Sequence, residues 1–184
     1  MKRTEIKKFI RDNSMIFPSE AENMYDALIK LPQAGRMLEI GTGFGHSTVF
    51  FAKTKPKWTI YTIDMYGLVG ELPNLYTNPE HKIEGKNIMD VLRYFDNFEA
   101  RNIIPIVQDV NKLEWELPLD ALFIDGDHSA PCVKYDFETF YPFIKKGGLV
   151  IFHDYLYFGV KEFLDTLDLK YTVKANVVFL WKKE

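Results

Sequence analysis

The sequence predicts an α/β protein with a doubly wound, mostly parallel sheet of seven strands that ends in an antiparallel hairpin. Short apolar strands alternate with helical patterns along most of the 184 residues. Near-continuous apolar strands between helices are typical of a parallel sheet covered on both faces. The last two strands are separated only by Ala175-Asn176, and a two-residue connection joins antiparallel neighbours.

The N-terminal part, 1–35, is predicted to be helical. Ser19 and Glu22 have the spacing of a capping box, and apolar residues then follow one helical face until Pro32 and Gly35 stop the helix. The first strand is expected over 36–40, directly before a glycine-rich loop and a second helix.

The remaining elements keep the same rhythm. We expect strands over 58–64, 103–109, 119–124 and 149–152, helical faces around 88–95 and 133–144, and the hairpin strands 170–174 and 177–181. The segment 65–87 is irregular and rich in glycine, proline and aromatic residues, so it is predicted to be a lid insertion over a substrate, with a disordered surface loop as the alternative.

Composition predicts one compact domain over 1–184. Hydrophobic residues make up 47% of the chain and aromatic residues 15%, enough for a core and too many for a disordered chain. A net charge of −3 gives no electrostatic footprint for nucleic acid. One cysteine, no signal-peptide pattern and no long apolar run favour a cytoplasmic protein without membrane contact.

Three glycines at alternating positions, Gly41, Gly43 and Gly45, follow the first strand. Glycine lets the chain turn sharply and lets a ligand approach the backbone. A dinucleotide-binding loop would place its third glycine at position 46, where His46 stands, and this disfavours a dehydrogenase. With Glu39 before the loop, the pattern resembles the first motif of class I S-adenosylmethionine-dependent methyltransferases, which implies a Rossmann-like fold and S-adenosylmethionine as the cofactor.

Two further strand ends agree with that resemblance. Asp64 closes the second strand, where a carboxylate can accept hydrogen bonds from both ribose hydroxyls. Gln108 and Asp109 close the third, at the position that contacts the adenine amino group in the family. The resemblance therefore implies cofactor contacts from these three residues, from Glu39 and from the glycine loop.

The next strand ends carry acids and histidines, in Asp125-Gly126-Asp127-His128 and in His153-Asp154-Tyr155. Over 37–155 the chain resembles metal-dependent small-molecule O-methyltransferases of the catechol and macrolide-sugar types. The resemblance implies that Asp125 and Asp154 bind Mg²⁺ or another divalent cation, that Asp125 also touches the cofactor and takes part in catalysis, and that His128 is the general base.

One position departs from the pattern of the catechol enzymes. Tyr155 stands where they have an asparagine, so we expect a third protein oxygen to come from Asp127 or another acid. Asp127 is equally compatible with capping a turn. His153 is expected to pack beside the end of the sheet rather than to bind metal.

The leading hypothesis is therefore methyl transfer from S-adenosylmethionine to a hydroxyl of a small molecule, assisted by a divalent cation. The alternatives are a metal-independent methyltransferase acting on a nitrogen or a protein, and a non-catalytic S-adenosylmethionine-binding module. Residues 1–18 are open to two uses, as a cover over the site or as the contact of a homo-oligomer. The identity of the acceptor leaves no mark in the sequence.

Overall fold

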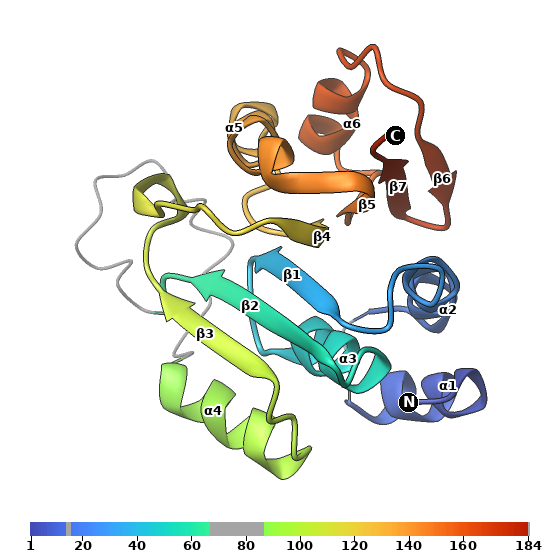
Figure 1. The fold of residues 1–184 in the computed structure, drawn as a ribbon, viewed down its shortest axis with the longest axis vertical. Coiled ribbons are helices and arrows are strands. Elements are labelled where there is room, and N and C mark those ends of the chain that lie inside the picture. Colours follow the sequence, from blue (N-terminus) through green and yellow to red (C-terminus); the bar gives the residue numbers. More distant parts are fainter. Residues whose placement is uncertain (14–15, 67–86, 184) are drawn as a thin grey trace.

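A computed structural model describes residues 1–13, 16–66 and 87–183 (Figure 1). The predicted lid, 65–87, lies outside the described residues except at its two ends. The α-helices are α1 Arg3–Asn13, α2 Pro18–Leu28, α3 His46–Thr54, α4 Ile88–Asn97, α5 Ala130–Phe140 and α6 Phe158–Leu164. The strands are β1 Gly35–Ile40, β2 Trp58–Asp64, β3 Ile103–Val107, β4 Leu119–Ile124, β5 Ile144–Phe152, β6 Thr172–Lys174 and β7 Val177–Trp181, with 3₁₀ turns η2 at Val110–Lys112 and η3 at Tyr141–Phe143.

The seven strands form one sheet in the order β3-β2-β1-β4-β5-β7-β6. The first five pair in parallel, whereas β7 runs antiparallel to both β5 and β6. This confirms the predicted doubly wound sheet and its terminal hairpin. The order reverses beside β1, so the carboxyl ends of β1 and β4 flank the crevice where open α/β sheets bind ligands.

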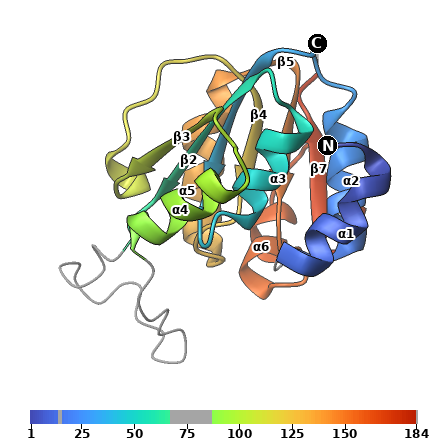
Figure 2. The ribbon, with the colours of Figure 1, turned by 90° about the horizontal axis from the view of Figure 1, so that it is seen from below.

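Helices cover both faces of the sheet. Helices α1 to α4 lie on one face and α5 and α6 on the other, as Figures 1 and 2 show from two directions. Successive strand residues point to opposite faces: Met37 of β1 joins the first core, and its neighbour Leu38 joins the second. The continuous apolar pattern of the strands thus supplies two cores at once.

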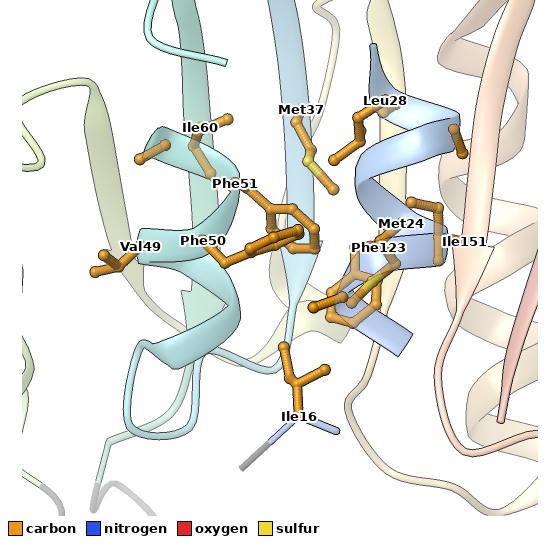
Figure 3. Packing of buried hydrophobic residues seen from close by; sticks show 14 of the residues in the cluster. Ile16, Met24, Leu28, Met37, Val49, Phe50, Phe51, Ile60, Phe123 and Ile151 are labelled. Carbon is orange, nitrogen blue, oxygen red and sulfur yellow. The ribbon is translucent and has the colours of Figure 1, made fainter. Parts of the chain in front are cut away.

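The first core contains Trp58, Phe50, Phe51 and Phe123, which are among the largest fully buried side chains of the described residues. Figure 3 shows Phe50 and Phe51 of α3 and Met24 of α2 meeting over Met37 and Phe123 of the sheet. The ring centroids of Phe51 and Phe123 lie 4.9 Å apart at 71°, an edge-to-face contact of the kind aromatic pairs prefer. This packing fixes α2 and α3, whose first turns both reach the ligand-binding edge of the sheet.

Several sequence-based expectations need correction. Strand β5 begins at Ile144, which was expected on a helical face, and not at Leu149, and strand β6 begins at Thr172 and not at Lys170. Helix α2 begins at Pro18 and not after Ser19, because the Glu20 carboxylate accepts a hydrogen bond from the Phe17 amide (2.9 Å). The third strand ends at Val107, two residues early. Helix α6 was not predicted: it spans seven residues, too few for a clear helical period, and buries Val160, Phe163 and Leu164 in the second core.

None of the helices in the described part of the chain is long and apolar enough to cross a bilayer. The longest contain 11 residues, whereas a transmembrane helix needs about 20.

Candidate active site

The glycine loop turns the chain from β1 into α3 through left-handed backbone conformations. Gly41, Gly43 and Gly45 have φ angles of +92°, +53° and +82°, which L-residues with a side chain rarely adopt. A Cβ on Gly41 would lie 2.2 Å from the Asp125 backbone oxygen. Gly41 therefore also permits the close approach of the β1 and β4 ends, while Gly45 faces the ring of Phe95.

Glu39 lies under this loop and is fully buried. Its carboxylate accepts hydrogen bonds from the hydroxyls of Ser47 (2.5 Å), Thr48 (2.5 Å) and Thr62 (2.6 Å). Burial raises the pKa of Glu39 to about 7, although the three hydroxyl donors act in the opposite direction. Glu39 thus ties the start of α3 to β1 and β2, and it does not line the cavity described below.

Asp64, at the end of β2, holds the other side of the loop. One carboxylate oxygen accepts from the Gly43 amide (2.9 Å) and the other from the Tyr66 amide (3.3 Å). Each oxygen has a second lone pair. A carboxylate fixed in this way on the cavity wall can accept the ribose hydroxyls that the sequence led us to expect.

A cavity of about 560 Å³ opens above the loop, within the size range of small-molecule sites. It brings together most of the predicted site residues, which come from the ends of β1, β2, β3, β4 and β5. Its wall contains Gly41, Gly43, Asp64, Gln108, Asp109, Asp125, Asp127, His128 and Asp154. Gly45, like Glu39, lies behind this wall.

Gln108 and Asp109 lie just beyond β3 and are held by local hydrogen bonds. The side-chain amide of Gln108 donates to the Lys112 carbonyl (2.8 Å). One Asp109 oxygen accepts from the backbone amide (3.0 Å) and the side-chain amide (2.8 Å) of Asn111. Both side chains reach the cavity with hydrogen-bonding capacity left over. Their placement is compatible with the adenine contact that the resemblance implies.

At the far end of the cavity, two carboxylates face two imidazoles. His128 Nε2 lies 3.5 Å from Asp125 Oδ1 and 3.2 Å from Asp154 Oδ2. His153 Nδ1 lies 3.2 and 3.3 Å from the same two oxygens. Both nitrogens are buried, yet neither forms a hydrogen bond of good geometry with any described residue. We call these four residues the acid–histidine cluster.

The charges of the cluster are strongly coupled. Burial lowers the pKa of His128, but the carboxylates of Asp125 and Asp154 outweigh it and raise the pKa to about 9. The same carboxylates, with Glu20, outweigh burial at His153 and raise its pKa to about 12. The close approach of His128 and then of His153 holds the pKa of Asp154 well below its ordinary value.

The donor set fits a divalent cation. Donor atoms of Asp125, His128 and Asp154 lie within 4.8 Å of one another. Two ligands at about 2.1 Å from one ion, at angles between octahedral and tetrahedral, are about 3.0 to 3.4 Å apart. The imidazole–carboxylate separations of 3.2 to 3.5 Å match that spacing, and the unsatisfied ring nitrogens supply free lone pairs once deprotonated.

Asp127 and Tyr155 are not brought into this cluster. One oxygen of Asp127 accepts from the Ser129 amide (2.7 Å), the capping use that the sequence left open. The Tyr155 amide donates to the Asn176 carbonyl (3.1 Å). Asp127 still lines the cavity, so a role for it in binding stays a prediction.

Sequence reasoning missed two supports of the cluster. Asn176, in the β6–β7 turn, donates its side-chain amide to Asp154 Oδ1 (2.7 Å) and leaves Oδ2 to face the imidazoles. Glu20 of α2 reaches His153 Nε2 at 3.2 Å. The only sequence signal for Asn176 was its place in a two-residue turn. For Glu20 the sequence predicted only that it lies in a helix, and nothing indicated its contact with His153.

The sheet order with its antiparallel β7, the left-handed glycine loop and the carboxylate after β2 occur together in class I S-adenosylmethionine-dependent methyltransferases. Residues 38–155 match the family model described as "Methyltransferase domain". This match covers more than half of the chain, so the protein belongs to that methyltransferase family, as its sequence motifs indicated.

One curated relative is the protein R132 of Acanthamoeba polyphaga mimivirus, 34% identical over 119 residues. The match covers 64% of this chain, and the chain spans only half the length of that relative.

Solved structures agree on the fold. The O-methyltransferase NovP superposes with a TM-score of 0.75 at 16% identity, over 100% of this chain and 89% of that one. An rRNA methylase from Streptococcus thermophilus superposes with a TM-score of 0.62 at 15% identity, over 89% and 96%. Because methylases of such different acceptors share this fold, the acceptor has to be argued from the site itself.

Proposed function

We propose that the protein transfers a methyl group from S-adenosylmethionine to a hydroxyl of a small molecule with the help of a divalent cation. One observation carries the proposal: the acid–histidine cluster lies in the same cavity as the glycine loop and Asp64. A methyl donor on the loop and an oxygen acceptor at the cluster would therefore meet inside one enclosure. Such positioning supplies much of the rate in a two-substrate displacement.

The donor half of the cavity suits the cofactor. S-adenosylmethionine supplies a methyl group bound to a sulfonium. Asp64 is placed to accept the ribose hydroxyls, Gln108 and Asp109 to bind the adenine edge, and the bare backbone of Gly41 and Gly43 to admit the ligand closely. Asp125, between the two halves, adds negative charge where the sulfonium needs it.

The acceptor half suits a hydroxyl whose proton has to be removed. A divalent cation held by Asp125 and Asp154 would lower the pKa of a hydroxyl bound to it. His128 is the group that takes this proton. Next to the two carboxylates, and without a cation, the pKa of His128 is about 9, so the ring stays protonated at pH 7. A cation bound to the same carboxylates would offset their negative charge and lower that pKa, and His128 would then serve as a base.

The mouth of the cavity favours an acceptor with an apolar body. Phe17 and Phe44 lie on its wall, 69% and 46% exposed, and they give the cavity an apolar surface that a ligand can contact. Tyr157 stacks on His128 with 4.9 Å between ring centroids and extends the aromatic surface beside the proposed base.

The cofactor and cation sites are tested by calorimetry. We expect S-adenosylmethionine to bind the purified chain, and Asp154→Ala to abolish the effect of magnesium or manganese on turnover while leaving cofactor affinity nearly intact. Asp168→Ala, an exposed change beyond α6, is the matched control. Unchanged cation dependence in Asp154→Ala would remove this residue from the cation site.

The acceptor is tested with S-adenosylmethionine labelled in the methyl group. Panels of hydroxylated small molecules, amines, proteins and rRNA are incubated with the enzyme, and the methylated atom is identified by mass spectrometry. Label on a small-molecule oxygen supports the proposal. Label on nitrogen or protein that persists with a chelator supports the metal-independent alternative, and cofactor binding without transfer to any panel supports a non-catalytic module.

A further inference from the structure

We infer that His153 is a ligand of the cation, held in place by Glu20, and that the site therefore selects a first-row transition-metal ion over Mg²⁺. This inference rests on the cation of the proposed function, and it names a residue that binds this cation and the kind of ion that the site prefers. The sequence analysis led to a different expectation, in which His153 only packs beside the end of the sheet and the cation is bound by carboxylate oxygens.

His153 approaches the two aspartate oxygens as closely as His128 does. Its Nδ1 approaches Asp125 Oδ1 and Asp154 Oδ2 at 3.2 and 3.3 Å, against 3.5 and 3.2 Å for His128 Nε2. These values agree with the separation of about 3.0 to 3.4 Å between two ligands of one ion. Nδ1 is buried and forms no hydrogen bond with the described residues, so a cation is the partner it lacks.

Glu20 fixes the orientation of that ring. The side chain is 2% exposed, and one of its oxygens, Oε2, lies 2.9 Å from the Phe17 amide and 3.2 Å from His153 Nε2. With a proton on Nε2 donated to Glu20, the lone pair of Nδ1 points at the two aspartates. Metal-binding histidines commonly donate their second nitrogen to a carboxylate in this way, which fixes the tautomer and raises ligand basicity.

Packing leaves the ring little freedom. The edge of the Phe123 ring lies against His153, with 6.0 Å between centroids at 63°, and the side chain is 12% exposed. The contact with Phe123 agrees with the expected position beside the sheet end. Packing and ligation are thus compatible, because Nδ1 of the packed ring still lies 3.2 and 3.3 Å from the two aspartate oxygens.

The resulting donor set determines the preferred ion. One imidazole nitrogen, from His153, and the two aspartate oxygens suit Mn²⁺, Fe²⁺, Co²⁺ or Zn²⁺ and leave His128 as the base, whereas Mg²⁺ prefers oxygen donors and retained waters. Further protein oxygens are not gathered at the cluster among the described residues: Asp127 caps Ser129, and Oδ1 of Asp154 is occupied by Asn176. Among the described residues the cluster thus offers Mg²⁺ only the two aspartates, whereas the imidazole nitrogen adds a donor that transition-metal ions bind better than Mg²⁺ does.

The test uses metal ions alone with the full chain and no cofactor. Titration with MnCl₂ and MgCl₂ should show that Mn²⁺ binds at least about tenfold more tightly. His153→Asn should weaken Mn²⁺ binding strongly, and Glu20→Gln by about 10- to 100-fold, as for other carboxylates behind a metal-bound histidine. Glu22→Gln on the same helix, where Glu22 pairs with Arg3 and Lys7, should leave Mn²⁺ affinity unchanged.

Two further readouts separate ligation from structure. Electron spin echo spectroscopy of bound Mn²⁺ should detect directly bound imidazole nitrogen, and this signal should be lost in His153→Asn and unchanged in His46→Asn. Thermal unfolding without metal shows whether each variant is folded; in Glu20→Gln the amide oxygen of the new side chain can still accept from the Phe17 amide. A folded Glu20→Gln with parental Mn²⁺ affinity would limit Glu20 to helix capping and overturn its proposed role.

The inference fails if His153→Asn binds Mn²⁺ as tightly as the parent, if the nitrogen signal does not change, or if Mg²⁺ binds as tightly as Mn²⁺. It also fails if no cation binds. The proposed function is judged separately, by cofactor binding and methyl transfer. A chain that binds Mn²⁺ through His153 and transfers no methyl would refute the function alone.

Discussion

Replacing Glu39 by glutamine should remove a pH-dependent loss of stability from the centre of the fold. Burial raises the pKa of Glu39 from 4.5 to about 7. When a carboxyl has the higher pKa in the folded state, the folded protein binds more protons than the unfolded one between those two values. The free energy of unfolding therefore falls as the pH rises from about 4.5 to about 7 and stays lower above that range.

The size of the effect follows from the two pKa values. At about 1.4 kcal/mol per pKa unit, ionising Glu39 in the folded state costs about 3 kcal/mol, of which about 2 to 3 kcal/mol appears between pH 5 and pH 8. Glutamine has the same shape and no charge in this range. The stability of Glu39→Gln relative to the parent should therefore rise by that amount over the interval, on top of a constant offset from its altered hydrogen bonds.

Urea unfolding at several pH values measures this directly, because Trp58 is 2% exposed and its fluorescence reports the loss of the core. Glu162→Gln, an exposed change on α6, is the matched control and should give a difference independent of pH. A flat difference for Glu39→Gln would refute the reasoning, since it would mean that the hydroxyls of Ser47, Thr48 and Thr62 hold Glu39 ionised throughout.

Two other changes test the cofactor half of the site. Asp64→Ala should weaken S-adenosylmethionine binding by about 1.5 to 3 kcal/mol, the usual contribution of hydrogen bonds to a charged partner. Calorimetry measures this loss, and a thermal unfolding temperature equal to that of the parent shows that the variant is folded. Unchanged affinity would mean that Asp64 does not bind the cofactor. Gly41→Ala should destabilise the fold more than Gly147→Ala in urea unfolding. Both positions have positive φ, which costs about 1 to 3 kcal/mol for alanine, but only at Gly41 would the Cβ meet backbone, at 2.2 Å from the Asp125 oxygen, while the Gly147 Cβ has no neighbour within 4 Å. Equal losses would show that the loop opens at little cost.

The strands of the sheet could be predicted from the sequence because each strand has the same local pattern. Each strand is an apolar run with a turn at its end, and parallel neighbours bring those ends to one edge. Asp64, Asp125 and Asp154 could be placed together on that ground alone, and the structure does bring Asp125 and Asp154 within 4.8 Å of His128. The spacing of Gly41, Gly43 and Gly45 likewise locates the loop from the sequence alone.

Short elements and side-chain choices were less predictable. Helix α6 has seven residues, so its helical period was not recognisable. The start of α2 depended on whether Glu20 or Glu22 accepts a hydrogen bond from the backbone amide that precedes the helix. Asp127 was a candidate ligand by type and position. Its local hydrogen bond to Ser129 competes with that use, and sequence offers no measure of which interaction prevails.

The contacts that complete the acid–histidine cluster lie beyond any local pattern. Glu20 meets His153 across 133 positions of sequence, and Asn176 meets Asp154 across 22. Each of the two comes from a segment outside the 38–155 range of the family match: one from the helix before the first strand, the other from the terminal hairpin. The family core thus supplies the aspartates and the glycine loop, while the flanking segments orient side chains of the acid–histidine cluster.

This division has a consequence for how the site is assembled. His153 can present Nδ1 to the aspartates only while α2 is docked, because Glu20 holds Nε2, and Asp154 can present Oδ2 only while the β6–β7 turn is formed, because Asn176 holds Oδ1. A cation that binds this arrangement and not the undocked one must stabilise the docking of both segments, by linkage. Cation affinity and the packing of the N-terminal helix are therefore expected to change together, although Met24 and Leu28, which pack α2 onto the core, never touch the site.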